Sequence, residues 1–392
     1  MMRTRVLVPL SAMTVVLAIS LSAPVRAAGQ APGQDPDREA AREAARKAAP
    51  HSGDQAGAYW DGEVAKKIAE ATSRVYDPSR PLPANPPRTP WGDPDISGYF
   101  VTQSYTPLQR SASVTKPLYT PEEAILAFRA TIEADSKVDP ADVHYDWKEF
   151  GMDAWQSPIT PNLRTALIVD PPDGRLPPIT AEARKRRADA AARAKILDPQ
   201  TAVSTFPSTY TRCAIGNGQI PMLRGGNPDS AGGLGSAGGV TAEKQIFQSP
   251  GYVVIQNQSN NDIRIVPLSG GELPDSIRFW EGVSRGHWDG NTLVIETANF
   301  RDRGPSDFPF EATENMTVVE RISYLDEKTL RYEYTVTDPS TWTRPWSVET
   351  PLPRIDPPLY EFACHEQNYG LINLVMGAQI TATKDGQIPS GR

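Results

Sequence analysis

One carboxylate, Glu320, stands among apolar residues on a strand expected over residues 317–324. Side chains alternate across a β-strand, so four apolar residues share its face: Met316, Val318, Ile322 and Tyr324. A carboxylate on such a face either pairs with a cation such as Arg344, or has a raised pKa that suits a general acid or base. The pattern favours structural pairing and leaves the acid/base role open.

Two tryptophans flank an arginine on another expected strand. Trp342, Arg344 and Trp346 fall on one face, which places a guanidinium between two indoles. This is either a structural cation-π stack or a site where Arg344 orients an anionic or carbonyl group of a bound ligand. Tyr332 and Tyr334 add phenols to an otherwise apolar face. The candidate ligand-binding residues are Trp342, Arg344, Trp346, Tyr332, Tyr334 and Glu320.

His287 is the second candidate acid/base group. It lies just before Asp289-Gly290, a pair typical of a two-residue hairpin turn, where a histidine is often only a hydrogen-bonding surface residue. A metal site built from His287, His365 and nearby carboxylates matches no known ligand spacing, so no metal is predicted. The glycine-rich residues 216–239 lack the G-K-[ST] of a P-loop, and G-x-S-x-G is absent, so no cofactor is predicted either.

The first residues have the pattern of a secretory signal peptide. Arg3 and Arg5 precede an apolar run from Val6 to Leu21, and a small-residue cleavage signal ends at Ala27. We therefore expect residues 1–27 to be removed and the chain to be periplasmic or secreted, with no integral membrane span left.

An exported chain with two cysteines most simply pairs them, here Cys213 with Cys364. The bridge would close 364 − 213 = 151 residues and contribute about 4–5 kcal/mol in the chain-entropy model. Two free buried thiols or a soft metal site are the alternatives.

Composition limits the possible partners. The 392 residues carry a net charge of −7 and a pI near 5.3, so nothing favours nucleic acid as a partner.

The 38 prolines argue against an all-helical bundle and for long irregular connections. The length allows one sizeable core with an appended region, or two domains. The oligomeric state does not follow from the sequence.

The elements that would position the candidate residues follow one another from residue 244 onward. About eight strands are expected, and the pattern predicts a mainly β fold with an antiparallel barrel over residues 205–392, because closure removes exposed strand edges. The expected strands cover 251–257, 262–268, the hairpin 277–300, 317–324, 329–337, 342–351 and 359–365.

A Pro-rich, partly helical region precedes the barrel. Residues 28–87 read as a helical and Pro-rich tail or linker, with helices over 35–49 and 61–76. Residues 88–204 read as an α+β accessory region packed on the barrel, with helices over 120–136 and 181–196 and a strand over 164–170. Thr120 and Glu123 form a capping box, and Pro121 occupies the first helical position.

Several segments together resemble a widespread family of exported bacterial proteins without an assigned function. They are PRTPWGDPDISG, TRCAIGNGQIP, IFQSPGYVVIQN, DIRIVPL, SRGHWDGNTLVIETANF, VVERISYLDEKTLRYEYTVTDPSTWTRPW and YEFACHEQNYGL. The resemblance implies almost no biochemistry, and the strands resemble lipocalin-like small-ligand barrels only at the level of the fold. In that family, Gln258, Asn261 and Val283 tend to be Glu, His and an acidic residue, and His287 varies, which weakens a catalytic role for His287.

These observations lead to two hypotheses of different class. The first is an exported β-barrel that binds a small, partly apolar or aromatic ligand in its interior. The alternative is a cofactor-independent lyase, isomerase or hydrolase with Glu320 or His287 as acid/base and Arg344 stabilising an oxyanion. A third possibility is an envelope structural protein. Whether the chain is an enzyme is left open.

Overall fold

The computed structural model describes residues 53–136, 158–196, 213, 220–223, 243–258, 262–270, 274–303 and 310–356, and most of 359–384 with gaps. By its contacts the chain divides into two units, Met1–Ser52 and Gly53–Arg392, and every described residue belongs to the second. The expected signal peptide, the helix over 35–49 and Cys364 lie outside the described residues.

The helices are α2 (Gly53–Thr72), α3 (Pro121–Ser136), α4 (Ala181–Ile196) and α6 (Tyr369–Lys384). The expected capping box begins α3: the Glu123 amide donates to Thr120 Oγ1, and the Thr120 amide donates to the Glu123 carboxylate. Phe128 and Ile132 of α3 are buried in one small cluster with Val64 and Ile68 of α2. None of the described helices combines the length and apolar content that crossing a bilayer requires.

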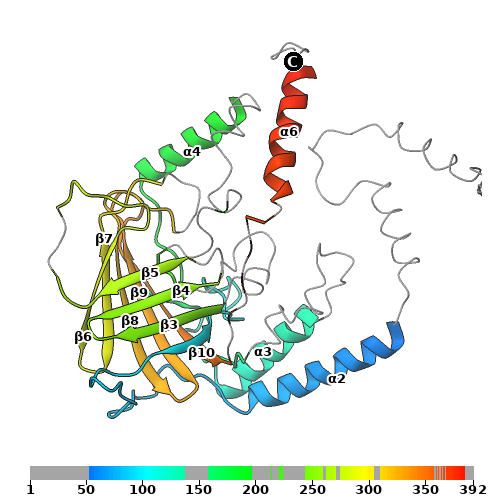
Figure 1. Ribbon diagram of the computed structural model, residues 1–392. Coiled ribbons are helices and arrows are strands. Elements are labelled where there is room, and N and C mark those ends of the chain that lie inside the picture. Colours follow the sequence, from blue (N-terminus) through cyan, green and yellow to red (C-terminus); the bar gives the residue numbers. More distant parts are fainter. Residues whose placement is uncertain are drawn as a thin grey trace, which may run out of the picture. The chain divides into compact units, whose positions relative to one another are not determined.

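Ten strands form one antiparallel sheet (Figure 1). They are β1 (Gly98–Val101), β2 (Ile168–Asp170), β3 (Glu243–Ser249), β4 (Tyr252–Asn257), β5 (Ile263–Pro267), β6 (Val283–Asp289), β7 (Thr292–Ala298), β8 (Thr317–Asp326), β9 (Thr329–Thr337) and β10 (Trp346–Ile355). Their order is β5-β4-β3-β1-β10-β9-β8-β7-β6, and β2 pairs with β10 beside this path.

The sheet differs from the expected closed barrel of about eight strands. It has ten strands, and no backbone ladder joins its end strands β5 and β6. Three strands were not among those expected for the barrel: β1 and β2, which come from residues 88–204 and make that region part of the sheet, and β3, which precedes the first expected strand. The strand expected over 359–365 does not form at the described residues of that stretch.

The number of strands on the path sets the relative direction of the two end strands. Ten strands minus β2 leave nine on the path, and each of the eight successive pairings is antiparallel. After eight reversals β6 runs in the same direction as β5, so only a parallel ladder could join them, and none forms. The two strands nevertheless meet through side chains, since a Cβ built on Gly286 of β6 would lie 2.9 Å from Val266 and from Leu268. We call this contact between β5 and β6 the seam.

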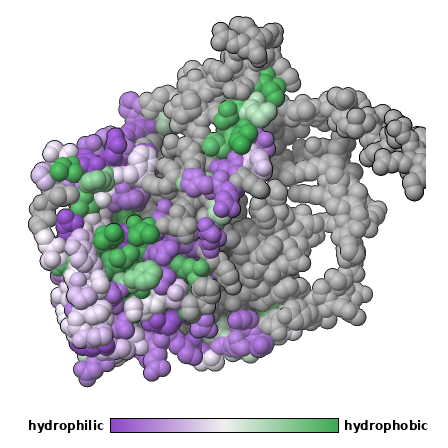
Figure 2. Space-filling model, in the orientation of Figure 1, coloured by the Kyte–Doolittle hydropathy of each residue, from purple (hydrophilic) through white to green (hydrophobic). Residues whose placement is uncertain are grey.

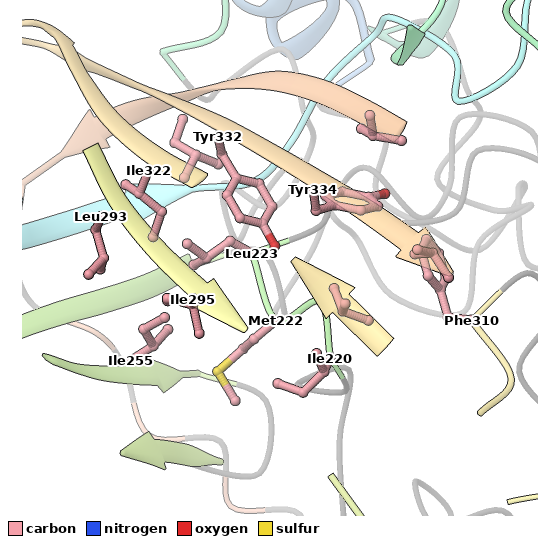
Figure 3. Packing of buried hydrophobic residues seen from close by; sticks show 14 of the residues in the cluster. Ile220, Met222, Leu223, Ile255, Leu293, Ile295, Phe310, Ile322, Tyr332 and Tyr334 are labelled. Atoms are coloured by element: carbon pink, nitrogen blue, oxygen red, sulfur yellow. The ribbon is translucent and has the colours of Figure 1, made fainter. Parts of the chain in front are cut away.

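The inner face of the sheet is filled by the chain itself. One continuous cluster includes Tyr332, Trp346 and Phe100, and the turn Ile220–Leu223 inserts three side chains into it (Figure 3). Ile220, Met222 and Leu223 face Tyr332, Ile255 and Ile295 in this cluster. Interior space that a small ligand would need is therefore largely occupied by buried side chains.

Gly286→Ala tests the close approach of the two strands at the seam. The added methyl would press on Val266 and Leu268, and overpacking of this kind costs about 1–3 kcal/mol of unfolding free energy. The matched control is Gly62→Ala in α2, where a Cβ meets nothing within 4 Å and the helix gains roughly 0.5–1 kcal/mol. Urea unfolding would compare the two variants, and a Gly286→Ala protein as stable as the parent would contradict the contact.

Candidate functional site

A buried arginine of β5 crosses the seam and bonds to three strands with which β5 does not pair. Arg264 Nε donates to Ser284 Oγ of β6 at 2.9 Å, and Nη2 donates to Thr297 Oγ1 of β7 at 2.7 Å. Nη1 and Nη2 also donate to the two carboxylate oxygens of Glu320 on β8, at 3.0 and 2.5 Å. The side chains thus make the connection that the backbone does not.

Because both charges are buried, each must be held in position by the other for the pair to be stable. Arg264 is 6% exposed and Glu320 is 0% exposed, so each charge has lost most of its water and needs the other in place. The Tyr332 hydroxyl adds a hydrogen bond to Glu320 at 2.6 Å. Burial, followed by the charge of Glu320, raises the pKa of Tyr332 well above its usual value, so Tyr332 remains a donor.

Glu320 therefore pairs with Arg264 and not with Arg344, the partner that the sequence suggested. Both its carboxylate oxygens accept hydrogen bonds, and no part of the residue reaches solvent. Arg264 lies between Ile263 and Ile265 in DIRIVPL, and the sequence analysis did not single it out. In a strand of this composition the isoleucines are the natural inward residues, but here they are 61% and 60% exposed and Arg264 points inward.

The expected guanidinium between two indoles does not form. Trp342 and Trp346 are buried and contact each other edge to face, with ring centroids 5.9 Å apart. Arg344 is half exposed and pairs with Asp170 of β2 at 2.7 Å. The alternation fails because β10 begins only at Trp346, so Trp342 and Arg344 precede the strand.

The tyrosine candidates are core residues in the structure. Tyr332 and Tyr334 are buried, and Tyr334 contacts Trp346 at a centroid distance of 6.0 Å. Phe310, which the sequence analysis did not single out, packs on both Tyr334 and Trp346. Four of the six candidate residues thus belong to one buried cluster: Trp342, Trp346, Tyr332 and Tyr334. Glu320 is joined to this cluster by its hydrogen bond with Tyr332.

His287 and the cysteines lie apart from this cluster. His287 is exposed on β6 and alternates with the inward residues Ser284 and Gly286. The hairpin turn itself is Gly290-Asn291, one residue later than expected, because Asp289 pairs with Thr292. Cys213 is buried, and no cysteine among the described residues is a free thiol; the bond to Cys364 stays a prediction. The described residues contain no group of three or more potential metal ligands.

A pocket of about 250 Å³ lies at the end of the seam where β5 and β6 begin. It is lined by Ile220, Met222, Asp262, Ile263, Arg264, Ile265, Glu281, Gly282 and Ser284. Hydrophobic side chains also gather on the nearby surface over β4 and β5 (Figure 2). Apolar walls around a few polar groups are the usual composition of a small-molecule site.

Backbone groups of β5 point toward this pocket. The Asn257 amide donates to the Asp262 carbonyl and the Leu268 amide to the Gly251 carbonyl, which fixes the alternate residues Arg264 and Val266 as the ones bonded to β4. The N–H and C=O of Ile263 and Ile265 are therefore directed toward the seam. Pro267 has no N–H to direct there, as is usual on an edge strand.

The charges around the pocket are mostly compensated. Arg264 is neutralised by Glu320, and Glu281 accepts hydrogen bonds from Arg303 at 3.2 Å and from the Ile220 amide at 3.1 Å. The remaining lining is apolar or hydrogen-bonding without charge, except for Asp262. Such a site suits a partly apolar molecule with both donors and acceptors better than a strongly anionic one.

The chain matches no protein-family model, no curated protein and no solved structure.

Removing one partner of the buried pair should be strongly destabilising. Arg264→Met leaves Glu320 buried without its cation and is expected to cost about 3–5 kcal/mol in urea unfolding. The double variant Arg264→Met/Glu320→Leu should recover much of this loss, because neither charge then remains. Arg344→Met is the matched control: it removes an exposed pair and should cost less than about 1 kcal/mol. A loss in Arg264→Met no larger than in Arg344→Met would contradict the buried pairing.

On the outer face of the sheet, two carboxylates lie directly opposite each other, Glu333 on β9 and Glu349 on β10. Glu349 is held by Arg164 at 2.6 and 3.0 Å and by the Tyr76 hydroxyl at 2.8 Å. Burial and, next, the charge of Glu349 raise the pKa of Glu333 above its ordinary 4.5. The paired carboxylate thus makes ionisation of its neighbour unfavourable.

The raised pKa of Glu333 determines whether this residue makes the folded state more or less stable as the pH rises. Between pH 4.5 and the raised value the folded state holds more protons on Glu333 than the unfolded state, so its contribution to stability falls as the pH rises. Glu333→Gln should therefore be more stable than the parent at pH 7, with the difference vanishing below pH 4.5. Thermal unfolding from pH 3.5 to 8 would measure it, and a difference that grows toward acid would contradict the assignment.

Proposed function

We propose that the protein is an exported ligand-binding protein, with a sheet that acts as a nearly closed, lipocalin-like barrel. In this proposal the ligand is a small, partly apolar or aromatic molecule that binds in the seam pocket. The signal-peptide pattern supports export, and the pocket beside Arg264 is the observation that carries the binding role. The packed aromatic residues Trp342, Trp346, Tyr332 and Tyr334 would support the wall of the barrel and not contact the ligand.

The chemistry of the pocket limits the ligand. Ile220 and Met222 offer apolar surface from the inserted turn, while Ser284 and the seam-facing backbone of β5 offer donors and acceptors. A ring system with one or two hydroxyl, keto or amide groups would match both kinds of surface. Terpenoids, steroids and substituted aromatic compounds are molecules of this kind.

The described contacts do not favour the enzymatic alternative. An acid/base role for Glu320 needs a carboxylate that can exchange a proton with substrate, whereas Arg264 and Tyr332 occupy both its oxygens. Arg344 pairs with Asp170 and is not among the residues that contact Glu320. Binding without catalysis is therefore the function that we propose.

Tryptophan fluorescence, titrated with aromatic, steroid and terpenoid compounds, tests the proposal. At least one class should give a saturating change, and Ile265→Glu, at an exposed position of the pocket wall, should weaken its binding at least about tenfold, or 1.4 kcal/mol. Phe247→Glu is the control: it changes an exposed apolar residue of β3 outside the pocket lining and should leave the affinity unchanged. A flat response to the whole panel, or equal binding by Ile265→Glu, would overturn the proposal.

A further inference from the structure

The outer face of β3, β4 and β5 carries an exposed apolar patch. The register of the three strands places nine outward positions in three rows, and the middle row is Phe247, Val254 and Ile265. Tyr252 and Ile263 lie in the rows on either side, and the other four positions hold two glutamines, a serine and a proline. None of the nine residues is charged. We call Phe247, Tyr252, Val254, Ile263 and Ile265 the outer patch; exposed apolar surface of this kind often marks an interaction site.

A second uncovered apolar surface lies on α6. Tyr369, Ile372, Met376 and Ile380 recur at positions i, i+3, i+7 and i+11, which places them on one side of the helix. Each of the four is 52–59% exposed, and α6 has no charged residue before Lys384. We call these four residues the helix stripe. A helix this apolar is normally covered by another part of a protein.

The outer patch and the helix stripe match in size and in chemistry. The stripe is about 16 Å long at 1.5 Å per residue, and the patch extends about 13 Å along its strands and about 10 Å across them. A helix packed on the face of a sheet is one of the standard ways in which both elements bury their apolar sides. Because neither surface carries a charge, contact between them would leave no buried ion without a partner.

Both surfaces are uncovered in the same chain, so a second copy of the chain supplies the complement that each of them needs. Two copies related by a two-fold axis make two identical contacts of this kind. Four residues of the outer patch and the four of the helix stripe are 42–61% exposed. At roughly 200 Å² per large side chain, two contacts would cover on the order of 1,600 Å², which is the usual size of a stable interface. A bilayer is a poorer match, because helices that lie on membranes are usually rich in Lys and Arg beside their apolar side.

We propose that the protein forms a two-fold dimer in which the helix stripe of each copy docks on the outer patch of the other. This proposal does not rest on ligand binding at the seam pocket. Ile263 and Ile265 belong both to the outer patch and to the lining of that pocket, whereas Phe247 does not line it. Substitution of Phe247 therefore tests the dimer without altering the pocket.

Sedimentation velocity of the full chain measures the dimer and its dissociation constant. The parent chain should be dimeric. Phe247→Glu on the outer patch and Met376→Glu on the helix stripe should each raise the dissociation constant at least about a hundredfold, because each substitution places a charge in both contacts. Val319→Glu on the outer face of β8 and Leu374→Glu on the opposite side of α6 are the matched controls. They place the same charge at exposed apolar positions outside the two surfaces and should leave the dimer intact.

An equimolar mixture of Phe247→Glu and Met376→Glu separates this arrangement from other dimers. The intact helix stripe of the first variant can dock on the intact outer patch of the second, so a mixed dimer with one of the two contacts should form where each variant alone is monomeric. A dimer held by α6 against α6 would survive Phe247→Glu, and one held by sheet against sheet would survive Met376→Glu. A monomeric parent chain, a dimer that survives either variant, or a mixture of the folded variants that stays monomeric would overturn the proposal.

Discussion

The ion pair between Arg264 and Glu320 spans the seam between the two end strands of the sheet, which no backbone ladder joins. Nine strands in alternating directions bring β5 and β6 together running the same way, and no backbone ladder joins them. Arg264 reaches across the gap to Ser284, Thr297 and Glu320, and the Tyr332 hydroxyl completes the network. A polar network is tolerated in this core because its members satisfy one another, and this sets the relative positions of the end strands.

The seam pocket lies between the same two end strands. Where Gly286 approaches Val266 and Leu268, the end strands pack closely, whereas at Ile263 and Ser284 an accessible volume remains. Unpaired strand edges carry hydrogen-bonding groups that a ligand can use, and the inserted turn at Ile220 adds apolar surface. A sheet that closes through side chains can thus keep a small binding site at its seam while its interior stays packed.

Local signals in the sequence predicted the local structure well. The capping box at Thr120 and the hairpin before Thr292 depend on neighbours within a few residues, and both formed with at most a one-residue shift. Glu320 was recognised as unusual, but its partner was not, because Arg264 lies 56 residues away and the pairing depends on sheet order. The Trp342–Trp346 prediction failed for a local reason: it assumed a strand four residues before β10 begins.

Hydrogen exchange of the β5 amides tests the central claim most directly, namely that side chains and not a backbone ladder close the seam. The amides of Arg264 and Val266 bond to β4, while those of Ile263 and Ile265 face the seam. Exchange measured by NMR should therefore be slow at Arg264 and Val266 and much faster at Ile263 and Ile265. Equal, strong protection at all four amides would mean that a backbone ladder closes the sheet, and would contradict this account.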